Sequence, residues 1–294
     1  MNVLSSPPAA NQNAPKTAPV AEKNAFQIND LKAKVARLER AGPGSAGSAR
    51  WSRHKDRVAT IGAPELEAHL PWGGLPRGAL HEVAGEGADR EHAAASAGFA
   101  ALWLARLQAA GPVLWIVRAA SRSAMDLYAH GLRRLALDPD RLILAAARRD
   151  DEALWSMEEG LKAKALGAVL GEVGKLDLTE SRRLQLAAEA SGVTAFVLRR
   201  WRLMELAERE AAQPIAVVTR WRIAALPTAS SDGDLHWRVN LARCRGGRPG
   251  TWLMEKADGS DFIQAAPLSG DLAEVLGHRS PTAGAAIRQC QNVG

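Results

Sequence analysis

Cysteine is nearly absent from this chain of 294 residues, which contains only Cys244 and Cys290. Two cysteines cannot form a disulfide framework, so a disulfide-rich secreted protein is excluded. Long hydrophobic runs are missing too: the best one, at 93–105, is too short to cross a membrane. The first residues, MNVLSSPPAANQN, lack the basic start and apolar stretch of a secretion signal. These absences favour a protein of the reducing cytoplasm with no membrane partner.

The remaining composition is that of a globular protein. Hydrophobic residues make up 47% of the chain and charged residues 24%, which is enough apolar material to bury a sizeable interior. The length predicts one core of roughly 200 residues with appendages.

Lysine is also scarce, and arginine supplies 29 of the 38 basic residues behind the formal net charge of +6. Residues 199–248 contain ten arginines, no lysine and five acidic residues, and residues 1–50 carry a net charge of +4. Two basic segments therefore flank a mildly acidic middle. A GC-rich genome would explain the excess of arginine codons, whereas contact with nucleic-acid phosphates would explain where the arginines lie.

The first fifty residues divide into three parts. Residues 1–24 are rich in Pro, Ala, Asn and Ser and are predicted to be a disordered tail. Residues 25–41 are predicted to form an amphipathic basic helix, and residues 42–50, which contain GPGSAGS, a flexible linker. The helix is therefore tethered. A short helix with one apolar stripe must dock, either on its own core or on a partner.

Residues 51–264 alternate strand-like and helix-like segments. Nearly all-apolar strands are expected at 80–83, 113–117, 142–146, 168–170, 194–198 and 215–218. Helices are expected at 89–110, where Asp89 could act as the cap, and at 123–135, 151–165, 179–190 and 203–211. Short buried strands separated by helices predict an α/β fold, with a mostly parallel sheet sandwiched by helices.

The pattern changes after residue 226. Trp237, Val239 and Leu241 alternate with polar residues, and CRGGRPG forms the turn into residues 251–255, which predicts a C-terminal antiparallel hairpin. Residues 265–294 are rich in Pro, Gly and Ala and are expected to be a flexible C-terminal tail.

In an open parallel sheet, the turn after the first major strand usually holds a phosphate group. Here the turn reads GEGADREH, and of the phosphate-binding template GxxxxGK[ST] only Gly85 matches. Arg90 replaces the second glycine, Glu91 the lysine and His92 the hydroxyl residue. The turn also holds three carboxylates, and one like-charge pair at 4 Å costs about 1 to 4 kcal/mol, whereas a helix N-terminus returns only about 0.3 to 1 kcal/mol. The nucleotide site is therefore degenerate.

No other cofactor or catalytic site is expected from the sequence. The seven histidines show no HxxxH spacing and the cysteines no CxxC spacing, so no metal site is predicted. No nucleophile motif of the GxSxG type is found.

The residues before the turn resemble the start of the RecA core. The motif GGLPRGALHEVAG, at 73–85, is similar to the RecA-type GGLPxG that leads into a strand ending in ExxG, and the order of strands and helices stays similar down to about Arg200. RecA-type enzymes carry a catalytic glutamate after the second strand, where this chain has no acid. Glu172 could correspond to their metal-binding acid, but lacks its lysine and hydroxyl partners. The loops with which RecA grips DNA are shortened to 174–178 and missing after Leu198.

A degenerate RecA core with a separate basic helix before it and WRVNLARCRGGRPGTWLME at its end resembles the ImuA family. The resemblance implies a non-catalytic adaptor of damage-induced (SOS) mutagenic translesion synthesis. It implies contacts with RecA and with the inactive polymerase-like protein ImuB, and through ImuB with an error-prone DNA polymerase. The protein would be cytoplasmic and would join the nucleoid when recruited. Two alternatives are a SulA-like inhibitor of cell division and an ATP-dependent RecA-type recombinase.

Two surfaces are candidates for partner contacts. The basic helix would copy the helix by which one RecA subunit docks on its neighbour, through the apolar residues Ile28, Leu31, Val35 and Leu38. A surface for single-stranded DNA or an acidic partner would be formed by six arginines: Arg199, Arg200, Arg202, Arg243, Arg245 and Arg248. Exposed tryptophans among them could stack on bases. The alternatives are a helix packed on its own domain, and a solvated basic face around core tryptophans.

Overall fold

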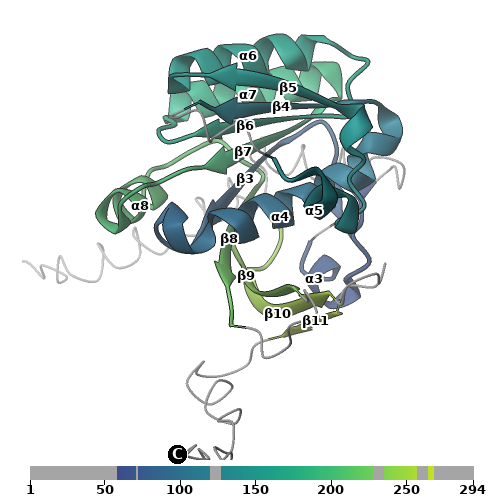
Figure 1. The fold of residues 1–294 in the computed structure, drawn as a ribbon, viewed down its shortest axis with the longest axis vertical. Helices are drawn as coiled ribbons and strands as arrows, with labels where there is room; N and C mark the ends of the chain where they lie inside the picture. The colour runs from purple at the N-terminus through teal and green to yellow at the C-terminus, as the bar shows by residue number, and fades with distance from the viewer. Residues whose placement is uncertain (1–57, 71, 120–126, 228–234, 257–263, 268–294) are drawn as a thin grey trace, which may run out of the picture. The chain divides into compact units, whose positions relative to one another are not determined.

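The computed structural model describes residues 58–70, 72–119, 127–227, 235–256 and 264–267 (Figure 1). The predicted N-terminal helix, with its candidate contact residues, and the C-terminal tail from residue 268 lie outside the described residues. No helix in the described ranges is long and apolar enough to cross a bilayer.

The described strands form one large sheet and a two-stranded one. The large sheet contains β3 (Leu80–Gly85), β4 (Val113–Arg118), β5 (Leu142–Ala147), β6 (Ala168–Val173), β7 (Thr194–Arg199), β8 (Thr219–Ala225), β9 (Leu235–Cys244), β10 (Gly250–Lys256) and β11 (Gln264–Pro267). The antiparallel pair consists of β1 (Val58–Ala59) and β2 (Leu75–Pro76). The helices are α3 (Pro64–Glu67), α4 (Asp89–Leu107), α5 (Ala129–Arg134), α6 (Asp150–Lys162), α7 (Leu178–Ser191) and α8 (Met204–Ala211), with short 3-10 turns η2 (Gln108–Ala110) and η4 (Pro139–Arg141).

The large sheet has the order β11-β10-β9-β8-β3-β7-β6-β4-β5. Strands β8, β3, β7, β6, β4 and β5 run parallel, and β9, β10 and β11 continue the sheet in antiparallel fashion. The prediction of a mostly parallel α/β sheet with a C-terminal antiparallel hairpin is confirmed. Because β3 lies in the middle, the turn that follows it sits among the carboxyl ends of its neighbours.

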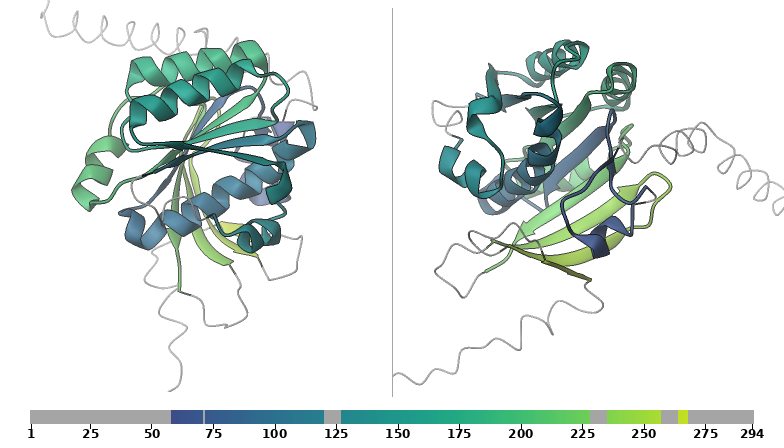
Figure 2. Two further views of the ribbon diagram at one scale, coloured as in Figure 1. Left: turned by 45° about the horizontal axis from the view of Figure 1, so that its top comes forward. Right: turned by 90° about the vertical axis from the view of Figure 1, so that its right-hand side faces the viewer.

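Helices cover the two faces of the sheet separately (Figure 2). Helix α4 packs on one face, where Phe99 and Trp103 meet Trp221 of β8. Helices α6 and α7 pack on the other, where Met157 and Leu184 share a second apolar cluster. Strands buried from both sides explain why the sequence of this region shows nearly continuous apolar runs.

The structure differs from the sequence prediction at three places. The strand expected at 215–218 lies instead at Thr219–Ala225. The prediction missed it because Arg220 and Arg222 interrupt its apolar pattern. Asp89 is the first residue of α4 and its side chain forms no cap; Ala88 occupies the cap position. Strand β11, which was not predicted, pairs with β10 and crosses the expected domain boundary at residue 264.

Candidate functional site

The turn after β3 is tied to three other segments by its own backbone and side chains. The amide of Glu86 donates to the carbonyl of Ile223 (3.0 Å), and the amide of Asp89 donates to the carbonyl of Trp201 (2.8 Å). The carboxylate of Glu86 accepts from the guanidinium of Arg238 on β9, with Nε at 3.0 Å. Backbone N–H groups are what a phosphate-binding turn offers to its ligand. Two of them are already occupied here.

Side chains crowd the same turn. A Cβ atom on Gly85 would lie 2.8 Å from the Cβ of His92, and one on Gly87 would lie 2.7 Å from the terminal methyl of Met204 at the start of α8. The ring of His92 accepts a hydrogen bond from the amide of Ala225 through Nδ1 (3.2 Å). His92 therefore belongs to the packing between α4 and β8. The other two replacements, Arg90 and Glu91, are exposed on the first turn of α4.

Glu172, on β6, accepts hydrogen bonds from three donors, two on β4 and one just after β7. Arg200 reaches it over 2.8 Å, the indole of Trp115 over 3.4 Å and the amide of Arg118 over 3.2 Å. The other arm of Arg200 donates to the carbonyl of Ala93 in α4 (3.1 Å). The guanidinium thus bridges β6 and the first turns of α4.

Asp89 lies near this bridge, at the start of α4. Burial raises the pKa of its carboxyl group, and the positive charge of Arg200 opposes the shift. The Asp89 carboxyl group is therefore partly shielded from water, which disfavours its charged form.

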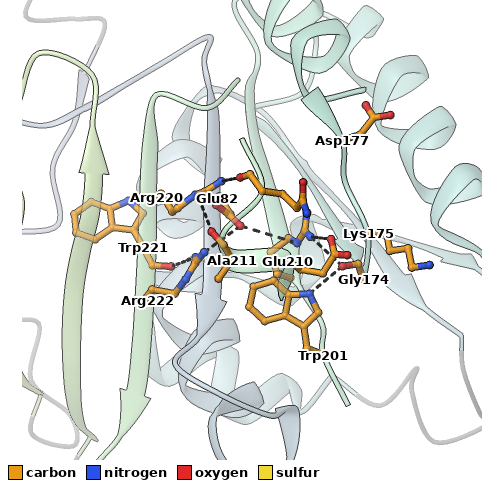
Figure 3. Close-up of polar contacts among 12 residues, drawn as sticks. Glu82, Gly174, Lys175, Asp177, Trp201, Glu210, Ala211, Arg220, Trp221 and Arg222 are labelled. Carbon is orange, nitrogen blue, oxygen red and sulfur yellow. Dashed lines mark hydrogen bonds and ion pairs between the residues drawn. The ribbon is translucent and has the colours of Figure 1, made fainter. Parts of the chain in front are cut away.

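A second charged group consists of Glu82 on β3 with Arg199 on β7 and Arg220 and Arg222 on β8 (Figure 3). We call it the Glu82 network. Glu82 is fully buried, with Nε of Arg220 at 2.5 Å, an NH2 group of Arg222 at 3.5 Å and Nε of Arg199 at 4.0 Å. The register of the strands brings these side chains together, because Glu82 pairs with Arg220, and Ala84 pairs with Arg199 on one side and with Arg222 on the other. One carboxylate is therefore shared by three guanidinium groups.

The arginines of the network have further partners that use the planar fork of the guanidinium. Arg199 donates to Glu210 of α8 and to the carbonyl of Gly174, both at 3.0 Å. Arg199 and Arg222 also lie against the ring of Trp201, at 5.3 and 5.6 Å from its centroid. Burial lowers the pKa of both guanidinium groups, and the charge of Glu82 opposes that shift. The network fastens β7, β3, β8 and α8 to one another.

His81 forms a polar chain on the opposite face of β3. The indole of Trp221 donates to the hydroxyl of Thr219 (2.8 Å), which lies 2.8 Å from Nδ1 of His81. Nε2 of His81 donates to the carbonyl of Pro76 (3.0 Å). Burial lowers the pKa of His81 to about 4, so the ring is neutral near pH 7. The ring thereby holds the GGLPRG segment onto the sheet.

The six arginines predicted to form one surface do not lie together. Arg199 is buried and Arg200 is paired with Glu172, while Arg202 is exposed just after β7. Arg243 lies at the end of β9, and Arg245 and Arg248 lie in the turn that follows. Cys244, the last residue of β9, pairs with Thr219 at the amino end of β8. The two halves of the predicted surface are thus at opposite ends of the sheet, and the prediction of a single surface was wrong.

Of the two interpretations of the tryptophans, the one that places them in the core is confirmed, and the one that exposes them for stacking was wrong. The tryptophans in and beside the arginine-rich segment are at most 6% exposed: Trp201, Trp221, Trp237 and Trp252. They pack in the core, so they offer no stacking platform for bases.

The end of β9 and the turn that leads into β10 carry three arginines on a backbone held by hydrogen bonds. The amide of Arg248 donates to the carbonyl of His69 (3.2 Å), and the amide of Arg245 donates to the carbonyl of Val218 (2.9 Å). Gly246 adopts a positive φ of 74°, which glycine allows without strain. Arg243 and Arg248 are exposed and Arg245 is half-buried, and their side chains have no ion-pair partner in the described ranges. We call this set the arginine turn.

Within the described ranges, no three His, Cys, Asp or Glu side chains are grouped as metal ligands would be. Together, the mostly parallel sheet and its antiparallel extension define a RecA-like α/β protein, in which the turn after β3 is occupied by contacts of the chain itself.

The comparisons with known proteins agree with this class. No family model matches the chain. The chain is 38% identical over 210 residues to Protein ImuA of Caulobacter vibrioides (strain NA1000 / CB15N). The aligned region covers 67% of this chain and 83% of that relative. The same values hold for Protein ImuA of strain ATCC 19089 / CIP 103742 / CB 15. The chain belongs to the ImuA family.

Proposed function

We propose that this chain is a non-catalytic accessory protein of damage-induced mutagenic translesion DNA synthesis. Membership of the ImuA family supports this role, because the family resemblance implies a partnership with RecA and with an ImuB-like protein, and through the latter with an error-prone polymerase. The adaptor would be recruited to the nucleoid through these partners.

The observation that carries the non-catalytic part of the proposal is the position of Arg200. Its guanidinium bridges Glu172 and the carbonyl of Ala93, where a metal–nucleotide complex would have to lie. Glu91, which replaces the template lysine, adds a negative charge on the same turn of α4. Restoring a nucleotide site would require displacing a paired, largely buried arginine, which is costly.

Equilibrium dialysis of the full chain against labelled ATP and Mg²⁺ tests this part, with RecA as the positive control. We expect no saturable binding at nucleotide concentrations that saturate RecA. Saturable binding would overturn the proposal and favour the ATP-dependent alternative.

The arginine turn is the part of the described surface that best suits contact with DNA. Three unpaired guanidinium groups on a rigid turn can contact phosphates, and the absence of exposed tryptophans beside them favours contact with the backbone alone. Single-stranded DNA is the substrate that translesion synthesis presents, and it is the partner proposed for this turn.

Pulldown of purified RecA, an ImuB-like protein and the division protein FtsZ by the full chain tests the partner assignment. We expect RecA and the ImuB-like protein to be retained. Retention of FtsZ alone would contradict the proposal and favour the SulA-like alternative.

The contact between the N-terminal helix and RecA stays a prediction, because Ile28, Leu31, Val35 and Leu38 lie outside the described residues. Deleting residues 1–45 should weaken RecA binding, and unchanged affinity would contradict a role for this helix.

A further inference from the structure

The arginine turn lies at the amino ends of the parallel strands. The amide of Arg245 donates to the carbonyl of Val218, just before β8, and the amide of Val218 donates to the carbonyl of Leu80 at the start of β3, both over 2.9 Å. From there the parallel strands continue in the order β8-β3-β7-β6-β4-β5 (Figure 1). At a strand spacing of about 4.8 Å, their amino ends form an edge about 24 Å long.

Three further cations enter the sheet at this edge. Arg77 precedes β3 and Lys164 precedes β6, and each is the only charged residue of its connection. Arg141 is the last residue before β5, and the connections before β4, β7 and β8 contain no charged residue. Cations therefore lie at β8, β3, β6 and β5, about 5 to 10 Å apart along the edge. We call Arg77, Lys164 and Arg141 the basic edge.

The acids of these connections, and those in the last turns of α6 and α7, have partners of their own. These are Asp138 with the amide of Asp140 (3.0 Å), Asp140 with Arg133 (3.2 Å), Glu159 with Lys162 (2.6 Å) and Glu189 with the side-chain amide of Gln185 (2.7 Å). The three cations of the basic edge have no ion-pair partner in the described ranges. Together with Arg245 and Arg248, the connections carry five cations against the two acids Asp138 and Asp140.

Arg77 gives a second indication that a partner binds here. Its side chain is half-buried, and its Nε atom is shielded from water and has no hydrogen-bond partner among the described residues. Shielding part of a charged group that has no partner costs free energy. A phosphate at the outer nitrogens of the guanidinium would supply the partner. The backbone beside it is open, since no described atom lies within 4 Å of the place that a Cβ on Gly192, just before β7, would take.

The opposite end of the same strands suits a polyanion less well. The first turns of α4 and α6 add five acids there, namely Asp89, Glu91, Asp150, Asp151 and Glu152. Carboxylates among the cations repel phosphate groups. The distribution of charge therefore favours the amino end of the sheet.

We propose that single-stranded DNA bound at the arginine turn continues along the amino ends of the parallel strands, where Arg77, Lys164 and Arg141 contact further phosphates. This inference rests on the proposed contact between the arginine turn and single-stranded DNA and extends it. An edge of about 24 Å accommodates roughly seven nucleotides at a rise of 3.4 Å each, which is within the range of sites that bind single strands. The contacts go to the DNA backbone, so the DNA sequence matters little.

A salt titration with a fluorescently labelled dodecamer of thymidine, which is long enough to cover the edge, tests the proposal by anisotropy. The triple variant Arg77→Ala/Arg141→Ala/Lys164→Ala should reduce the slope of log affinity against log salt by about 2, the value for three phosphate contacts on a single strand. It should also bind at least tenfold more weakly than the wild type at low salt.

The matched control is Arg90→Ala/Arg148→Ala/Lys175→Ala. It removes the same three charges at the carboxyl ends of the strands, from exposed residues that have no ion-pair partner in the described part of the chain. We expect this control to keep the wild-type slope. Equal losses in the two triple variants would overturn the proposal, because net charge alone would then account for binding.

The outcomes separate the basic edge from the arginine turn. If replacing the three arginines of the turn weakens binding and replacing the basic edge does not, the turn contacts DNA and the extended path is wrong. Binding by the wild type that does not vary with salt would overturn both.

The path along the edge predicts one dodecamer per chain in calorimetry, and two per chain would show separate sites and contradict a continuous path. If the triple variant does not fold, the double variant Arg141→Glu/Lys164→Glu, which changes two exposed residues, decides the question. It should bind at least tenfold more weakly than the wild type, and wild-type affinity would refute the proposal.

Discussion

The guanidinium of Arg200 donates to the carboxylate of Glu172 over 2.8 Å, and both side chains are largely shielded from water. Removing one partner of such a pair leaves the other charge poorly solvated. Arg200→Ala should therefore lower the free energy of unfolding by about 2 to 4 kcal/mol, as measured by urea denaturation.

Arg202 provides the control for this substitution, since it lies two residues further along, is exposed and has no ion-pair partner among the described residues. Arg202→Ala should leave stability within about 0.5 kcal/mol of the wild type. Equal losses for the two variants would contradict the structural role of the Arg200–Glu172 pair.

Glu82→Gln should be more damaging, because Glu82 is the buried carboxylate shared by Arg199, Arg220 and Arg222. Loss of its charge leaves three guanidinium groups close together, at a cost of about 3 to 5 kcal/mol. Glu86→Gln, which affects the more exposed pair with Arg238, is the comparison. Thermal and urea unfolding should rank Glu82→Gln as the less stable variant, and the opposite ranking would refute the central role of the network.

His81 should make stability depend on pH in a defined window. Its folded pKa, about 4, lies below its ordinary value of 6.5, because burial opposes the charged form. The unfolded chain therefore binds more protons between these values, so the His81 contribution is complete above pH 6.5 and falls as the pH drops toward 4. The loss between pH 7 and pH 4.5 should be about 2 to 3 kcal/mol. Unfolding curves of the wild type and of His81→Gln should converge as the pH is lowered, and parallel curves would contradict this origin.

The two glycines of the turn after β3 should respond differently to alanine. A Cβ on Gly85 would meet the Cβ of His92, which the helix backbone holds in place, whereas a Cβ on Gly87 would meet the mobile end of the Met204 side chain. We expect Gly85→Ala to destabilise the fold by about 1 to 3 kcal/mol and Gly87→Ala to cost less. Differential scanning calorimetry would measure both, and a larger loss for Gly87→Ala would show that Met204 cannot yield.

The arginine turn should bind DNA mainly by charge. Replacing Arg243, Arg245 and Arg248 by alanine should weaken single-stranded DNA binding and reduce the slope of log affinity against log salt by about 2, the value for three phosphate contacts on a single strand. The control carries the same charge change on other exposed arginines, namely Arg106, Arg182 and Arg209. Similar losses in both triple variants would show that net charge alone acts, and binding that does not vary with salt would exclude phosphate contacts.

The order of strands and helices could be predicted from the sequence because strands covered on both faces leave continuous apolar runs. The start of β8 could not, since Arg220 and Arg222 interrupt its apolar pattern and their partner, Glu82, is distant in the sequence. The sequence did contain a signal: an acid in the buried stretch LHEVAG requires cations, and the alternation in TRWRIAA supplies them.

The loss of the phosphate-binding template was visible in the sequence, but the residues that occupy its place were not. Arg200 looked like part of a basic surface until the fold placed it beside Glu172. The division of the arginines between two ends of the sheet depends on strand direction, which composition does not reveal. The exposure of Ile143 and Leu144 on the edge strand β5 was missed for a related reason, because an apolar strand at an edge has the same sequence pattern as one in the middle.

The ties around the turn after β3 also restrict the mutational paths open to this chain. A lysine at position 91 would still face a turn whose Glu86 and Asp89 amides are bound to Ile223 and Trp201. Releasing those amides would require moving the backbone at Ile223 and Trp201 that binds them. Opening the region between β6 and α4 would require breaking the contacts of Arg200 with Glu172 and Ala93. Each of these steps alone loses stability and gains no ligand. Single substitutions therefore do not free this turn for a ligand, and the chain can acquire new activity more readily through its outer surfaces.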